Sequence, residues 1–255
     1  MGNFGLKHLI GLVWLFSLII IVLGILLTIR KKKGYSEKFD TTVIKWAAVF
    51  IWGWEIIKTI YIFNSSDYAG LGLYTAYMLP FHICSMGLYA YFILGFHPGK
   101  LADFIKPFSF STLLIVTSII LVIPDSSGIL GSVPNWSLVH DNILPFQSFL
   151  YHGTLVFVPL YMVLSGYYKP RVSDIGKASI TLLAVAIFAY TLNKILKVTD
   201  FMTLEYGYGN PFQSILQTNY LLYILILATV TIGGTALILF IAQILTGGLK
   251  RKQLK

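Results

Sequence analysis

Seven runs of mostly apolar residues, each about twenty residues long, take up nearly all of this 255-residue chain. At a rise of about 1.5 Å per residue, a helix of that length crosses a hydrocarbon core of about 30 Å. Hydrophobic residues make up 56% of the chain and charged residues only 11%, which is too apolar for a soluble domain. The sequence therefore predicts an all-α polytopic membrane protein, a single domain over residues 1–255 built as a bundle of seven transmembrane helices. The expected spans are residues 9–29, 43–63, 71–95, 104–123, 145–168, 175–196 and 219–245.

The basic residues predict the orientation of this bundle. Fifteen of the 19 Lys and Arg residues lie in or beside the first, third and fifth connections or in the C-terminal tail. Because cytoplasmic loops retain Lys and Arg, we expect the N-terminus outside and the C-terminus in the cytoplasm. The net charge of +9 is spread along one face of the membrane. That distribution favours contact with anionic lipid headgroups and argues against a nucleic-acid partner.

Polar and ionisable side chains inside the spans gather in the outer half of the membrane or near its midplane. Such groups cost at least about 2.5 kcal/mol each in a bilayer, so they normally face the bundle interior and pair. We therefore expect one polar cavity that opens outward, and no ionisable group inside the cytoplasmic half of a span. The residues concerned are Glu55, Lys58, His82, Cys84, His152, Asn193 and Lys194.

Helical spacing predicts some of the geometry of this set. Glu55 and Lys58 are three residues apart, acid before base, which suits an ion pair on one helix face. Lys194 lies near the outer end of its span, where a lysine commonly extends to the interface. His82 and Cys84 are two apart, so on a regular helix they point about 200° from each other. Only a distortion at Pro80 would let both face one cavity.

His152 is the strongest catalytic candidate among the ionisable residues. It shares a helix face with Ser148 at i−4 and with Pro159 at i+7. Pro159 frees the carbonyl of Leu155, as Pro80 frees that of Ala76, so both helices are expected to kink. The competing interpretation is a histidine that only hydrogen-bonds a neighbouring helix.

Four segments resemble the bacterial YwaF family of seven-helix membrane proteins, namely residues 79–85 (LPFHICS), 146–153 (FQSFLYHG), 158–161 (VPLY) and 206–212 (YGYGNPF). That family is similar in turn to the eukaryotic transmembrane protein 164 acyltransferases. The eukaryotic resemblance rests on a Pro-x-His that includes His82 and on His152 followed by Pro159. It implies transfer of acyl chains between membrane phospholipids and a lysophospholipid or other acyl acceptor. The bacterial resemblance implies a multi-pass protein of the bacterial plasma membrane.

One departure from the eukaryotic pattern bears on mechanism. The nucleophilic cysteine of that pattern stands where this chain has Phe81. Cys84, three residues further on, would share a helix face with that position and could replace the thiol. In one mechanism His152 activates Cys84 as a nucleophile. In the other, which we favour, His152 or His82 acts as a general base on the acceptor hydroxyl.

Substrate binding is expected at the remaining polar positions, and no cofactor is expected. A single cysteine and few histidines argue against a catalytic zinc site, although His82, Cys84, His152 and an acid could still hold one ion. Two non-enzymatic alternatives stay open: a transporter or ligand-binding protein, and a structural protein whose polar residues knit helices together. The predicted substrate-binding residues are Glu55, Lys58, Asn193, Lys194, Asn210 and Gln213.

Overall fold

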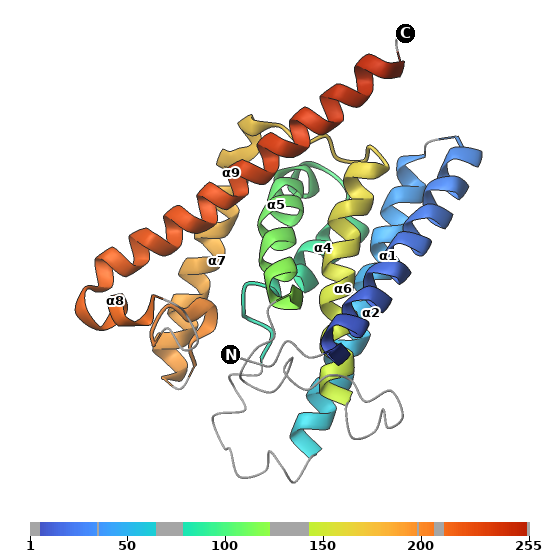
Figure 1. The fold of residues 1–255 in the computed structure, drawn as a ribbon. Coiled ribbons are helices and arrows are strands. Elements are labelled where there is room, and N and C mark those ends of the chain that lie inside the picture. The colour runs from blue at the N-terminus through green and yellow to red at the C-terminus, as the bar shows by residue number, and fades with distance from the viewer. Residues whose placement is uncertain are drawn as a thin grey trace.

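The structure, a computed structural model, describes residues 6–34, 36–64, 79–122, 143–197, 199–206 and 212–253. Within these ranges the chain is helical and contains no strand. Figure 1 shows the helices arranged as a bundle with one long oblique helix across it. The elements are α1 (Leu6–Lys32), α2 (Glu37–Asn64), α4 (Met86–Phe96), α5 (Lys100–Val122), α6 (Ile143–Leu164), η2 (Val172–Asp174), α7 (Ile175–Leu196), η3 (Phe201–Thr203), α8 (Gln213–Thr218) and α9 (Tyr220–Gln253).

Six of these helices, α1, α2, α5, α6, α7 and α9, are long and apolar enough to cross a membrane. Each coincides with an expected span, and α7 has the expected bounds. The third expected span differs from the structure. Its first part lies outside the described residues, residues 79–85 form bends and turns, and α4 has only 11 residues. A continuous helix over residues 79–95 was therefore the wrong prediction.

Proline chemistry accounts for this late start of α4. Pro80 has no N–H to donate and disfavours a helical conformation at Leu79. The chain enters the helix through short i to i−3 bonds, from Gly87 N–H to the Cys84 carbonyl at 3.1 Å and from Leu88 N–H to the Ser85 carbonyl at 3.0 Å. The distortion expected at Pro80 is thus a break that removes helical geometry from the whole segment.

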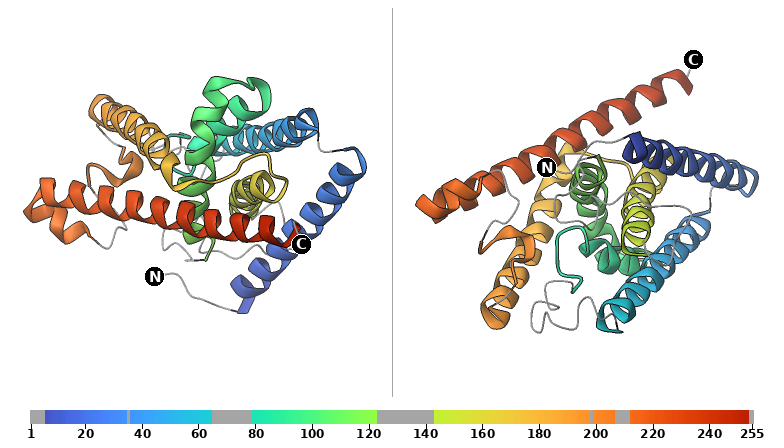
Figure 2. Two further views of the ribbon diagram at one scale, coloured as in Figure 1. Left: turned by 90° about the horizontal axis from the view of Figure 1, so that it is seen from above. Right: turned by 60° about the horizontal axis from the view of Figure 1, so that its bottom comes forward.

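Helices α5 and α6 form the centre of the bundle and are its most buried spans. Helix α6 packs against α5, α2 and α1, while α5 also packs against α4, α7 and α9. The two views in Figure 2 show α1 and α9 on the outside of this centre. Apolar side chains of α1, α7 and α9 remain exposed, as expected for surfaces that face lipid.

All predicted basic connections that the structure describes lie at one end of the bundle, called here the basic end. Figure 1 shows the turns that follow α1, α4 and α6 at the same end as the C-terminal part of α9, whereas α1 begins at the opposite end. Lys32, Lys100 and Arg171 belong to these turns or border them. The grouping agrees with the predicted sidedness. That the basic end faces the cytoplasm stays a prediction.

Two features bring α6 close to its neighbours. Gly153 lets α1 approach, since a Cβ at this position would lie 2.5 Å from the Leu15 side chain. Pro159 leaves the Leu155 carbonyl without its helical donor, and the Tyr91 hydroxyl of α4 donates to that carbonyl at 2.9 Å. The carbonyl that the sequence predicted to be free thus joins α4 to α6.

A buried ionic cluster near the basic end corrects another prediction. Arg30 of α1 donates from Nε to Asp40 Oδ1 at 2.6 Å and from Nη2 to Asp40 Oδ2 at 2.7 Å. The Tyr161 hydroxyl of α6 adds a bond of 2.7 Å to Asp40 Oδ1. All three residues are buried, so ionisable groups do occur inside the spans at this end. The sequence gave no warning because Arg30 begins a basic run typical of a loop.

Candidate functional site

His152, on the middle of α6, is held in a defined protonation form. Its Nδ1 lies 2.8 Å from the Ser148 carbonyl and 3.2 Å from Ser148 Oγ. Because a carbonyl can only accept, Nδ1 carries the proton, and the lone pair of the neutral ring is on Nε2. That Nε2 atom is buried and has no hydrogen-bond partner among the residues described. The ring is therefore preset to accept a proton.

The predicted ion pair of α2 is confirmed. Lys58 Nζ lies 2.6 Å from Glu55 Oε1, and the Glu55 side chain is only 6% exposed. Lys58 also interacts electrostatically with His152 and with Cys84. One turn of α2 thus supplies a positive charge to the same region as the histidine of α6.

Residues 84 and 85 come to this region from the turn before α4. Cys84 packs against the main core and interacts with Tyr151 of α6. The Tyr151 hydroxyl is buried, lies beside Ser85, and forms no hydrogen bond of good geometry to any part of the chain described. Sequence reasoning missed Tyr151, and its only signal there was a phenol next to His152 in the middle of a span.

The turn geometry also corrects the argument that linked Phe81 to Cys84. The i, i+3 relation assumed a helix, and these residues do not form one. Phe81 packs edge-on against Phe188 and Phe201, with ring centroids 5.5 and 5.6 Å apart. The position of the eukaryotic thiol is therefore part of an aromatic wall in this chain.

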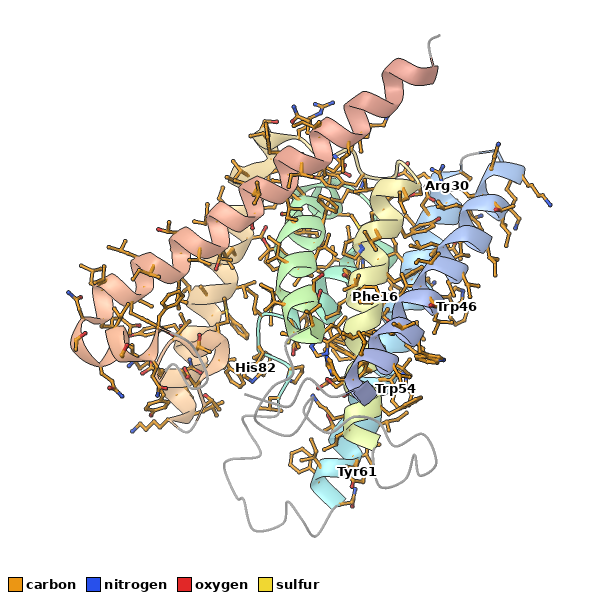
Figure 3. All side chains as sticks on the ribbon, in the orientation of Figure 1. Phe16, Arg30, Trp46, Trp54, Tyr61 and His82 are labelled. Carbon is orange, nitrogen blue, oxygen red and sulfur yellow. The ribbon has the colours of Figure 1, made fainter. Side chains whose placement is uncertain are left out.

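His82 lies on that wall, away from the basic end. Figure 3 labels it between the central helices and the lower part of α7, far from Arg30. Its ring meets Phe201 edge-on, with centroids 5.1 Å apart. The structure thus gives His82 an aromatic neighbour from η3, and the contacts described join Cys84 and His152, but not His82, to Lys58.

Asn193 of α7 holds the loop that carries Phe201. Its Oδ1 accepts from Phe201 N–H at 2.8 Å and from Thr199 Oγ1 at 3.0 Å, and its Nδ2 donates to the Phe201 carbonyl at 3.1 Å. The side chain is buried. Asn193 therefore fixes Phe201 against His82, a positioning role that sequence reasoning did not foresee.

The other predicted binding residues lie apart from His152 or beyond the described residues. Lys194 is exposed and pairs with Glu205 at 2.9 Å, as expected for a lysine near the end of a span. Gln213 begins the short helix α8. Asn210 lies outside the described residues. Within the described ranges, no three His, Cys, Asp or Glu side chains are grouped closely enough to hold a metal ion.

Together these features define a multi-pass helical membrane protein with a buried polar site formed by α2, the turn before α4, and α6. A model of the TMEM164 family matches residues 3–239 of the chain. The protein therefore belongs to the TMEM164 family. Comparisons with curated proteins and with solved structures find no match. The bacterial YwaF resemblance stays a prediction.

Proposed function

We propose that this protein transfers acyl chains between membrane lipids, or hydrolyses acyl esters, with His152 as the general base. One observation carries the proposal: His152 has its proton fixed on Nδ1 by the Ser148 carbonyl, while Nε2 is buried without a partner among the described residues. A buried polar atom left unpaired is costly, and such atoms recur at functional sites. Membership of the TMEM164 family supports a lipid substrate.

In the direct mechanism, His152 Nε2 removes the proton from the hydroxyl of a lysophospholipid. The hydroxyl oxygen then attacks the carbonyl carbon of an acyl ester, and a tetrahedral oxyanion forms. Lys58, which interacts electrostatically with His152, is the nearest identified positive charge that could stabilise that oxyanion. The intermediate collapses, the C–O bond of the donor ester breaks, and the leaving oxygen takes the proton from His152. With water as acceptor the same steps release a fatty acid.

A covalent variant uses Cys84. His152 takes the thiol proton, the sulfur attacks the donor ester, and the departing alcohol receives that proton. The acceptor hydroxyl then attacks the thioester and regenerates the thiol. The electrostatic interaction of Cys84 with Lys58 supports a role in the site. We favour the direct mechanism because Phe81 stands where the eukaryotic pattern has its cysteine.

The substrate is proposed to enter from the half of the membrane away from the basic end. Glu55 and Lys58 would contact its polar part, because they form a buried pair beside His152. His82 would border the site through the wall that Asn193 supports. Lys194, Asn210 and Gln213 remain candidates for binding the headgroup near the surface.

A transporter or ligand-binding protein is the second candidate, and one observation favours it. Buried ionisable groups occur at two depths, with Glu55 and Lys58 in one region and Arg30 and Asp40 near the basic end. A solute or proton path needs such groups along its length. Proton uptake into proteoliposomes that is lost in Asp40→Asn and in Glu55→Gln would favour transport over catalysis.

The direct test follows acyl chains by mass spectrometry. Purified protein is incubated with phospholipids and with a lysophospholipid whose headgroup is isotopically labelled. We expect labelled diacyl product, or free fatty acid, from the wild type and none from His152→Ala. A matched control is His97→Ala, since His97 lies at the end of α4 beside Phe92 and outside the site. Equal turnover by His152→Ala and the wild type would overturn the proposal, and Cys84→Ala then separates the two mechanisms.

A further inference from the structure

A groove on the outside of the bundle is unrelated to the His152 site. It has a volume of about 520 Å³ and lies between α1 and α2, with α6 as its floor. Its lining is almost wholly apolar and includes Leu15, Val22 and Leu26 of α1. The α6 residues that line it, such as Leu150 and Thr154, lie on nearly the opposite face of the helix from His152 and Ser148.

The groove is open to the membrane-facing surface and has the length of one leaflet. Trp46 and Phe50 line it and are 66% and 43% exposed. From Leu15 to Leu26 a helix rises about 16 Å, which is close to half of a hydrocarbon core of about 30 Å. An extended acyl chain from a single leaflet fits that length.

The end of the groove near the basic end carries a positive charge. Phe39 lines this end, and the Lys33 ammonium lies over the Phe39 ring, 5.5 Å from its centroid. Lys31 and Lys32 are exposed in the same turn. An apolar groove that ends at an exposed ammonium complements an amphiphile with an anionic headgroup and a long hydrocarbon chain.

We propose that this groove holds one anionic phospholipid, with an acyl chain along Leu15, Val22 and Leu26 and its phosphate at Lys33. The lipid belongs to the leaflet at the basic end. It is a resident lipid and not the acyl substrate, because the groove and the His152 site occupy opposite faces of α6. A juxtamembrane lysine contributes about 1 kcal/mol to binding of anionic lipid, equivalent to about a fivefold preference over a neutral lipid.

Native mass spectrometry of the full chain tests the proposal. The purified protein is equilibrated with phosphatidylglycerol and phosphatidylcholine of identical acyl chains. We expect one retained phosphatidylglycerol, preferred about fivefold. Lys33→Gln should abolish the preference, and Val22→Trp should remove the retained lipid by filling the groove. Ile21→Trp is the matched control, because Ile21 is exposed on α1 and does not line the groove.

The outcomes separate this lipid from the proposed substrate. His152→Ala should retain the lipid unchanged even if it loses all turnover. Equal retention by Val22→Trp and Ile21→Trp, both with wild-type circular dichroism, would overturn the assignment. So would an absence of headgroup preference in the wild type, or a dimer that only Val22→Trp dissociates, since that result would assign the groove to a second copy of the chain. Lys33→Gln changes an exposed side chain, so its result does not depend on repacking of the bundle.

Discussion

Two buried polar clusters, both built on α2 and α6, differ in how completely their atoms are hydrogen-bonded. Near the basic end, both Asp40 carboxylate oxygens accept bonds from Arg30, and Tyr161 adds a third. In the other cluster, His152 Nε2 and the Tyr151 hydroxyl have no good hydrogen bond within the described part of the chain. Because the same helices satisfy one cluster fully, the unpaired atoms of the other indicate a function beyond packing.

The contrast separates stability from chemistry. A fully bonded ion pair inside a membrane fixes helices relative to one another, and losing one partner leaves a charge without compensation. An unpaired base contributes little to folding but is available to a substrate. Substitutions in the first cluster should therefore change the free energy of unfolding, and those in the second should change turnover.

The largest expected effect on stability comes from Asp40→Ala. It leaves the buried Arg30 guanidinium unpaired, which should lower the free energy of unfolding by about 3–5 kcal/mol. Denaturant unfolding in micelles measures this loss. The double variant Arg30→Met with Asp40→Leu should recover most of it, since it removes both charges. A loss below about 1 kcal/mol for Asp40→Ala would place this pair with the weak solvated pairs and end the contrast.

A smaller effect comes from a matched pair of tyrosines on α6. Tyr161→Phe removes a bond to a carboxylate and should cost about 1.5 kcal/mol, near the upper limit measured between membrane helices. Tyr151→Phe removes a hydroxyl that lacks a good bond, so the free energy of unfolding should hardly change. Parallel unfolding curves compare the two. Equal losses would mean that Tyr151 is bonded as firmly as Tyr161.

Tyr91→Phe should have a still smaller effect, about 0.6 kcal/mol, the average for a hydrogen bond between membrane helices. Its hydroxyl bonds the Leu155 carbonyl that Pro159 leaves free. In a Pro159→Ala background the residue at 159 supplies an N–H to that carbonyl, so Tyr91→Phe should then cost less. A double-mutant cycle on unfolding free energies measures the coupling. Additive losses would separate the tyrosine bond from the proline.

The smallest effect concerns pH at the basic end. Burial, with Glu37, Asp103 and Asp40 nearby, raises the pKa of Tyr167 in the connection after α6 to about 12. Because the folded pKa is above the unfolded value of about 10, the stabilisation is complete below pH 10 and is lost as pH rises toward 12. The unfolding temperature from pH 9 to 11.5 should therefore fall less in Tyr167→Phe than in the wild type. Identical slopes would remove Tyr167 from this account.

Local helical spacing explains what the sequence predicted well. Apolar length located α1, α2, α5, α6, α7 and α9. The i, i+3 relation between Glu55 and Lys58 and the i, i−4 relation between His152 and Ser148 both hold, because each pair lies on one regular helix. These relations require no knowledge of how the helices pack.

Predictions that needed helix packing or irregular backbone went wrong. His82 and Cys84 were placed on a regular helix, but the turns around Pro80 remove that geometry. The bond between Arg30 and Asp40 was missed because a basic residue at the end of a span is normally in water. Asn193 bonds to residue 201 across a loop, a relation that no helical period could reveal.

The central claim, that His152 is the base of an acyl-transfer site, is tested most directly by the turnover rate of His152→Gln. Glutamine is polar and close in size but supplies no base, so the rate should fall about 10²- to 10⁴-fold, the usual contribution of a general base. Asp40→Asn, assayed at a temperature where it remains folded, should keep most of the wild-type rate. If His152→Gln retains the wild-type rate, the buried histidine is structural and the account is wrong.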